Sequence, residues 1–329
     1  MKPELYEPWQ GERRRLSGLL QSRGSRTGLP AWANLVFGGL VAVVGVGFML
    51  IGTRSVFINA SRVHAPNWML TAAGVSFALF GLMACGMASG QFMANRRRLQ
   101  AARQHPEEPA LQDYAWHPGG FELSPWTGVV KVVALAAGTT VFLSMFNWWA
   151  FAMSRDWMLR AIVMVLDGVG LVLWWQAAMK LGRALKFGQS RVGYTRFPYR
   201  LGEPVILLWR PGSGIARVRK GSFSLRCVEE WLEWSGSGKQ RNRKLVQEEL
   251  WNGTWVLAQP RTLQVTDSVE LQYELPADAL PTCLCGEKPV FWELEVKLEL
   301  SGLDFIGTYL VPIYGPKAIT RQEPVALGC

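Results

Sequence analysis

The sequence predicts a membrane protein in two parts, an all-α part of four transmembrane helices followed by an all-β part folded as an antiparallel β-sandwich. Three observations predict this class. Four long apolar runs lie within residues 31–182. Alternating apolar and polar residues between turn signals fill residues 203–315, as is typical of β-strands. Positive charge gathers beside the apolar runs, because residues 1–202 hold 21 Lys and Arg against 9 Asp and Glu, whereas residues 203–329 hold 14 against 16.

Each apolar run is long enough to cross a membrane. A helix rises about 1.5 Å per residue, so a run of roughly 20 residues spans the hydrocarbon core of a bilayer. The first two runs contain no charged residue, and the third holds only Lys131, near its start. The fourth holds Arg160 near one end and Asp167 near its middle. The predicted helices cover residues 31–53, 68–90, 127–151 and 157–179.

The distribution of Lys and Arg predicts the orientation of these helices. Six lie in the N-terminal segment of residues 1–30, two in the first interhelical loop, four in the second, one or two in the third, and six after the fourth helix. Because positively charged loops stay on the cytoplasmic side, both termini are predicted to be cytoplasmic. The same charges favour contact with anionic lipid headgroups of the bilayer. We do not expect nucleic-acid binding, since the β part is slightly acidic.

The β part begins after a basic connector at residues 183–202 and ends before a C-terminal tail at residues 316–329. Its length of about 115 residues, with six to eight strand-like segments, is typical of a β-sandwich. In residues 290–300, Trp, Leu and Val alternate with Glu and Lys. Successive side chains of a strand point to opposite faces, so we expect one face of this strand in the core and the other in solvent.

A hairpin is predicted between residues 222–234 and 244–257. In the first of these segments, Phe223, Leu225 and Cys227 fall on one face. The intervening residues 235–239 contain Gly-Ser-Gly-Lys, which superficially matches a phosphate-binding loop. Such a loop also needs an earlier Gly and a following Ser or Thr, and this chain has neither at those places. The segment is therefore predicted to be a flexible hairpin tip.

The five cysteines are scattered and odd in number, which predicts no disulfide framework and fits a reducing compartment for the β part. Cys283 and Cys285 form a Cys-Leu-Cys pair, but tetrahedral zinc needs four ligands and the β part contains no histidine. We therefore predict no metal site there.

The histidines give a weak candidate site. His105 and His117 share a loop with the carboxylates of residues 107, 108 and 113, which supply enough donors for a metal ion. Their spacing is not that of a zinc site, and the alternative is a set of solvated loop residues. No cluster of His, Cys and carboxylates has the arrangement of a catalytic or cofactor site, so the sequence predicts no enzyme and no cofactor.

Asp167 is the sharper candidate. A carboxylate near the middle of a transmembrane helix is costly when ionised and suggests a functional role. The alternative is a protonated Asp167 hydrogen-bonded to a neighbouring helix, with Thr139, Thr140 or Ser144 as its partner. A direct ion pair with Lys131 is not expected, because the two residues differ in depth.

Small residues four positions apart recur in the predicted helices and allow two backbones to approach closely. They can serve packing within the chain or the formation of a homo-oligomer. The pairs are Gly38 with Ala42, Gly74 with Ala78, Gly86 with Gly90, and Ala134 with Gly138.

Short motifs in residues 92–315 resemble a family of uncharacterised bacterial membrane proteins. They include His-Pro-Glu-Glu-Pro at 105–109, Tyr-Ala-Trp at 114–116, Phe-Trp-Glu-Leu-Glu-Val at 291–296, Gly-Leu-Asp-Phe at 302–305 and Val-Pro-Ile at 311–313. The resemblance implies a bacterial inner-membrane location and a C-terminal sandwich of the immunoglobulin or arrestin type. It implies no activity and no catalytic residues, and it favours protein binding by analogy.

Two functions are therefore expected from the sequence. The first is a membrane-anchored binding or scaffolding module that captures an unknown protein partner through the β-sandwich. The second is a small transporter or channel component that uses Asp167 in the membrane path.

Overall fold

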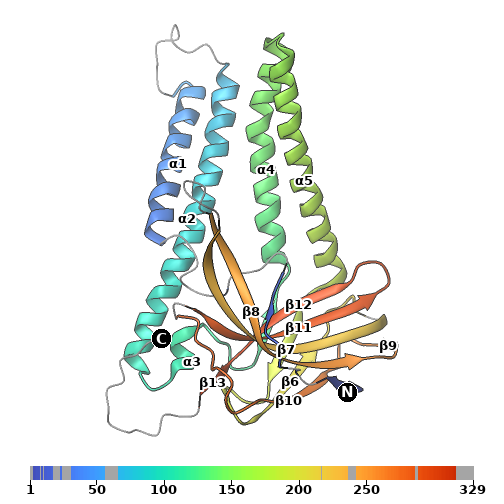
Figure 1. The fold of residues 1–329 in the computed structure, drawn as a ribbon. Helices are drawn as coiled ribbons and strands as arrows, with labels where there is room; N and C mark the ends of the chain where they lie inside the picture. The colour runs from blue at the N-terminus through green and yellow to red at the C-terminus, as the bar shows by residue number, and fades with distance from the viewer. Residues whose placement is uncertain are drawn as a thin grey trace. The chain divides into compact units, whose positions relative to one another are not determined.

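The computed structural model of the chain describes residues 3–7, 9, 11–17, 23, 31–55, 66–215, 217–235, 242–285 and 288–315. The chain divides into two compact units (Figure 1). The helical unit comprises Leu29–Met93 and Pro125–Ala184. The β unit comprises Met1–Gly28, Ala94–Ser124 and Leu185–Cys329.

Four helices of the described chain are long and apolar enough to cross a membrane. They run close to the predicted bounds, but the second and fourth extend further. The second continues to Gln104 because residues 91–104 are mostly good helix formers and the first Pro follows at position 106. The fourth ends at Phe187, before Gly188 with a φ of 61°. The helices are α1 (Ala31–Gly52), α2 (Asn67–Gln104), α4 (Trp126–Trp148), which continues as the π-helical turn η2 (Trp149–Met153), and α5 (Trp157–Phe187).

Helices α1 and α2 pack through small residues, as two of the predicted pairs suggested. A Cβ built on Gly81 would lie 2.4 Å from the backbone N of Ala42, and one on Gly45 would lie 2.4 Å from the backbone N of Ala78. Both backbones therefore meet where only glycine fits. A Cβ on Gly86, by contrast, would meet none of the described atoms within 4 Å, so the Gly86–Gly90 pair does not serve this contact.

The β unit contains two antiparallel sheets that share one apolar core. The long sheet has the strand order β1-β8-β7-β11-β12, with β2 also paired to β8 and β9 to β7, and the short sheet has the order β10-β6-β4-β3. Trp209 and Tyr273 from the short sheet and Phe223 and Trp292 from the long sheet are fully buried in this core. The strands of the long sheet are β1 (Leu5–Glu7), β2 (Arg14–Arg15), β7 (Arg217–Ser235), β8 (Asn242–Leu257), β9 (Arg261–Thr262), β11 (Val290–Leu300) and β12 (Phe305–Val311). Those of the short sheet are β3 (Phe121–Leu123), β4 (Ser190–Tyr194), β6 (Pro204–Arg210) and β10 (Val269–Glu274).

The predicted hairpin is confirmed as the pairing of β7 with β8. Its register runs from Gly221 opposite Leu257 to Ser235 opposite Asn242, with a bulge after Cys227. Phe223, Leu225 and Cys227 are buried, as their alternation predicted. The predicted tip at residues 235–239 lies, from residue 236 onward, outside the described residues.

The β unit is wider than residues 203–315. It gains β1 and β2 from the N-terminal segment, β3 from the loop between the second and third predicted helices, and β4 and β5 (Tyr199–Arg200) from the predicted connector. These strands have two to five residues each, too few for an alternating pattern to stand out in the sequence. Strand β5 pairs in parallel with β13 (Ile313–Tyr314).

The loop before α4 belongs to the β unit through specific contacts. In the short helix α3 (Pro109–Asp113), the Asp113 carboxylate accepts a hydrogen bond of 2.9 Å from the backbone N of Leu284. The indole of Trp116 donates to the Tyr314 hydroxyl at 3.0 Å. These contacts fix the loop against the sheet, where it contributes β3.

Candidate functional site

Asp167 forms the hydrogen bond to a neighbouring helix that the sequence suggested, but with a different partner. The Asn147 side-chain amide on α4 donates to Asp167 Oδ1 at 2.7 Å. Two of the three predicted partners bond elsewhere, since the Thr140 hydroxyl donates to the Ala136 carbonyl and accepts from the Trp174 indole, and the Ser144 hydroxyl donates to the Val141 carbonyl of its own helix. A carboxyl oxygen bonded to an amide donor links α4 to α5 without requiring a second charge.

A second polar contact links the start of α5 to the end of η2, which continues α4. The guanidinium of Arg160 donates to the backbone carbonyls of Ala150 and Ser154 at 3.1 and 2.9 Å. Carbonyls at a helix C-terminus lack partners within the helix, and a cation there also interacts favourably with the helix dipole. Arg160 therefore has a structural role in capping η2.

The histidine loop does not form a metal site among the described residues. His105 and His117 are exposed. The His117 ring accepts a hydrogen bond from the nearby backbone N of Gly119, and Asp113 is buried against Leu284. No group of three or more His, Cys, Asp and Glu that could hold a metal ion occurs in the described ranges.

The cysteines differ in burial. Cys85, Cys227 and Cys285 carry thiols, and of these Cys227 is buried. Burial raises the pKa of the Cys227 thiol to about 12, so this cysteine behaves as a core residue and not as a nucleophile.

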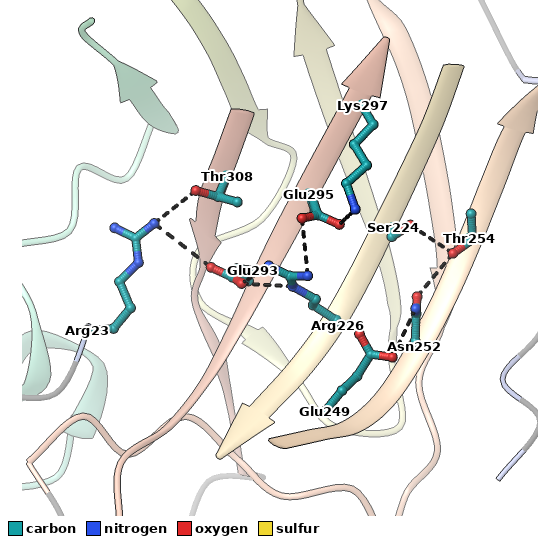
Figure 2. A network of polar contacts seen from close by, with 10 residues as sticks. All are labelled: Arg23, Ser224, Arg226, Glu249, Asn252, Thr254, Glu293, Glu295, Lys297 and Thr308. Carbon is teal, nitrogen blue, oxygen red and sulfur yellow. Dashed lines mark hydrogen bonds and ion pairs between the residues drawn. The ribbon is translucent and has the colours of Figure 1, made fainter. Parts of the chain in front are cut away.

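A buried network of charged residues lies on the face of the long sheet that points away from the shared core (Figure 2). We call it the outer-face network. Arg226 on β7 is its centre and contacts Glu293 Oε1 at 2.6 Å and Glu295 Oε1 at 3.2 Å, both on β11. The side chains of Arg226, Glu293 and Glu295 are only 12%, 5% and 14% exposed.

The sequence prediction for one face of β11 was wrong at Glu293. Because Glu293 alternates with the core positions, it was predicted to face solvent, whereas it is buried. The reason is a second apolar cluster on the outer face, formed by Val228, Leu284, Phe291 and Leu310, against which Leu16, Tyr114, Trp116 and Phe121 pack. The N-terminal segment and the loop before α4 therefore cover a face that a strand pattern alone assigns to water.

The charges of the network are paired across neighbouring strands, and Lys297 Nζ also lies 2.7 Å from Glu295 Oε2. Burial tends to lower the pKa of Arg226, but Glu293 and Glu295 outweigh it and raise that pKa, so the arginine stays charged. The pKa of Glu249 on β8 is raised above its usual 4.5 mainly by burial. Its carboxylate accepts a 3.2 Å hydrogen bond from Asn252.

The N-terminal segment is attached to this face and to its edge. Strands β1 and β2 pair with β8, and the backbone N of Leu16 donates to the Gln247 carbonyl at 2.8 Å. Arg23 reaches further across the sheet (Figure 2). Its guanidinium donates to Thr308 Oγ1 at 3.1 Å and lies 3.9 Å from Glu293 Oε2, and its backbone N donates to Glu230 Oε2 at 3.1 Å.

The opposite edge of the long sheet is β12, which pairs with β11 and with no further strand among the described residues. Ile306 on β12 is 61% exposed. The Tyr194 hydroxyl donates to the carbonyl of Leu310 at 2.6 Å and so covers one end of the strand. Beside the other end lies a pocket of about 400 Å³, lined by residues that include Ser222, Val256, Lys297, Phe305 and Ile306.

Sequence reasoning did not single out the outer-face network. The available signal was the charge pattern, since Arg226 on one predicted strand and Glu293 and Glu295 on another have opposite charges. Assigning them to one face would have required the register of two strands that are distant in the sequence.

No protein-family model matches the chain, and no curated protein matches it. Among solved structures, the crystal structure of Spo0M, a sporulation control protein from Bacillus subtilis, is similar to part of the chain with 14% sequence identity and a TM-score of 0.24. The match covers 38% of this chain and 48% of the Spo0M chain, so the chain spans about half the length of that protein. A likeness at this level carries no conclusion about function.

Proposed function

We propose that this protein is a membrane-anchored binding module without enzymatic activity, whose β unit captures an extended segment of a protein partner by strand addition to β12. The observation that carries the proposal is the edge of β12, which no further strand covers among the described residues. An open strand presents backbone donors and acceptors in a row, and an extended peptide satisfies them as an added strand.

The other edge of the same sheet supports this mode of binding. There the segments Leu5–Glu7 and Arg14–Arg15 are added to β8 as antiparallel strands. One edge of the long sheet thus already pairs with two short extended segments of this chain. The exposed Ile306 and the pocket beside it give β12 an apolar contact point for a side chain of the partner.

The location of the module is part of the proposal. The four apolar helices would cross the bacterial inner membrane, with both termini cytoplasmic as the alternation of Lys and Arg favours. The two antiparallel sheets would form a sandwich of the arrestin type. The side of the membrane on which the β unit lies is to be measured by maleimide labelling of the Cys285 thiol in intact cells.

Asp167 motivates a second candidate, a transporter or channel component. The specific observation is a half-buried carboxylate inside an apolar helix pair. Its bond to Asn147 also fits a purely structural role. Asp167→Asn keeps an oxygen acceptor for Asn147, so we expect insertion and folding to be unchanged. Loss of a solute or ion flux in this variant would favour the transport function, whereas unchanged flux removes its support.

The experiment that tests the binding function is affinity purification of the full chain from its native membrane with two matched variants. Ile306→Lys puts a charge on the β12 edge, which blocks strand addition. Val265→Lys places the same charge at an exposed apolar position in the loop before β10. The partner should be lost with Ile306→Lys and retained with Val265→Lys, and equal recovery with both variants would overturn the proposal.

A further inference from the structure

The outer-face network contains a feature that strand addition at β12 does not require, namely the way Arg23 is bound. Its side chain is 13% exposed, its guanidinium lies between Thr308 and Glu293, and its backbone N donates to the fully buried Glu230. Burying a guanidinium is costly unless it is paired, so these contacts amount to a specific site for an arginine.

The carboxylates of this site are held by the sheet independently of Arg23. Glu293 presents Oε1 to Arg226 at 2.6 Å and leaves Oε2 directed at Arg23. Glu230 Oε2 accepts a hydrogen bond of 2.8 Å from the Gln247 side chain. Acceptors that are already oriented do not have to be ordered when a ligand binds, which favours tight binding.

The ligand at present in the site is Arg23, from the N-terminal segment of the same chain. Between β1 and α1, the described residues of this segment form only the two-residue strand β2. Arg14 and Arg15 are exposed, and Arg15 contacts Glu233 at 3.6 Å with both side chains about half exposed or more. Such exposed contacts contribute little. The firmer contacts of the described residues are the pairing of β2 with β8, the packing and backbone hydrogen bond of Leu16, and the contacts of Arg23.

We propose that Glu230, Glu293 and Thr308 form a receptor for an arginine of an extended protein segment, that Arg23 occupies it in cis, and that an arginine-bearing segment of a partner protein exchanges with it. Thr308 belongs to β12, but it takes part through its side chain on the face of the sheet, so the receptor does not require the open backbone edge of β12. The partner is defined by its chemistry, an extended segment with an arginine flanked by residues able to pair with β8.

The test uses the full chain in detergent, with residues 11–24 replaced by a Gly-Ser linker of equal length so that β1 and its pairing with β8 remain. A fluorescein-labelled peptide of residues 11–24 is titrated in trans and binding is followed by anisotropy. We expect binding to the linker variant and at least about tenfold weaker binding to the unmodified chain, because the tethered segment competes at high effective concentration.

Two peptides of equal charge provide the control. An Arg23→Ala peptide loses the buried guanidinium and should bind at least about tenfold more weakly. An Arg13→Ala peptide loses the same charge at an exposed position and should bind within about twofold of the original. Equal affinities for these two peptides, or no binding of the original one, would overturn the proposal.

The receptor side is tested with Thr308→Val, which removes one acceptor and conserves side-chain shape. This variant should lower the affinity for the original peptide but leave the affinity for the Arg23→Ala peptide unchanged, because Thr308 and Arg23 are coupled only through their direct contact. If the linker variant lacks a thermal unfolding transition, the same peptides are titrated against the full chain carrying Arg23→Ala. The same order of affinities is expected there, and the absence of that order would also contradict the proposal.

Discussion

Replacing Arg226 with Met should destabilise the β unit strongly at neutral pH. The side chain keeps its length but loses its charge, which leaves Glu293 and Glu295 buried on one face without their shared cation. Removing one partner of a buried ion pair costs about 3–5 kcal/mol, much of it the penalty for the charge left behind. With a shift of about 2–4 °C per kcal/mol for a unit of this size, the unfolding midpoint should fall by roughly 6–20 °C.

The assay is thermal unfolding of the purified full chain in detergent, followed by β-sheet circular dichroism. The matched control is Arg196→Met, which breaks the ion pair of Arg196 with Glu203 at 3.5 Å, where the side chains are 70% and 42% exposed. That loss should cost at most about 1 kcal/mol. Adding Glu293→Met to Arg226→Met should restore part of the stability, because one of the two buried carboxylates that Arg226 paired is then gone. An Arg226→Met midpoint as close to the parent as that of Arg196→Met would refute the buried network.

Three further predictions follow from burial and close packing. Glu249→Gln should stabilise the β unit at pH 7 and lose this advantage near pH 4. Burial raises the pKa of Glu249, so the native state binds the proton more tightly than the unfolded state, and the stability of the parent falls as pH rises above the usual 4.5. Denaturation of parent and variant at the two pH values checks this, and a larger gain at pH 4 than at pH 7 would contradict it. Gly81→Leu should separate α1 from α2 and lower the free energy of unfolding by roughly 1–3 kcal/mol or more. Gly86→Leu should be tolerated, because a Cβ there meets no described atom within 4 Å. The unfolding midpoints of the two variants in detergent test this difference. Cys227, 1% exposed with a pKa of about 12, should resist iodoacetamide at pH 8 until the protein is unfolded, and rapid labelling of the native chain, detected by mass spectrometry, would contradict its burial.

The long elements of the fold could be predicted from the sequence because their signals are strong and local. The apolar runs and the alternation in β7 and β11 repeat over many residues, and the structure places these elements within a few residues of the predicted bounds, except where α2 and α5 continue as polar helix. The short strands could not be found in this way. Strand β3 has three residues and forms through pairing with β4, nearly 70 positions away in the chain.

The hydrogen-bond partner of Asp167 and the burial of Glu293 could not be predicted from the pattern of one helix or one strand. For Asp167, the alternative of a hydrogen bond to a neighbouring helix agrees with the structure, but choosing Asn147 over Thr140 requires the rotation of α4 against α5. For Glu293 the alternation was correct and the inference of solvent was wrong, because segments far away in the sequence cover that face. A face of a sheet is exposed only if nothing packs on it, and strand periodicity does not contain that fact.

The measurement that tests the central claim most directly is site-specific photocrosslinking in the native membrane, with p-benzoylphenylalanine at position 306 on the β12 edge or at position 265. Both positions are about equally exposed, at 61% and 57%, so their general reactivity is matched. A module that binds an extended segment along β12 predicts one defined protein adduct from position 306 and none from position 265. Adducts of the same kind from both positions, or from neither, would contradict binding at this edge.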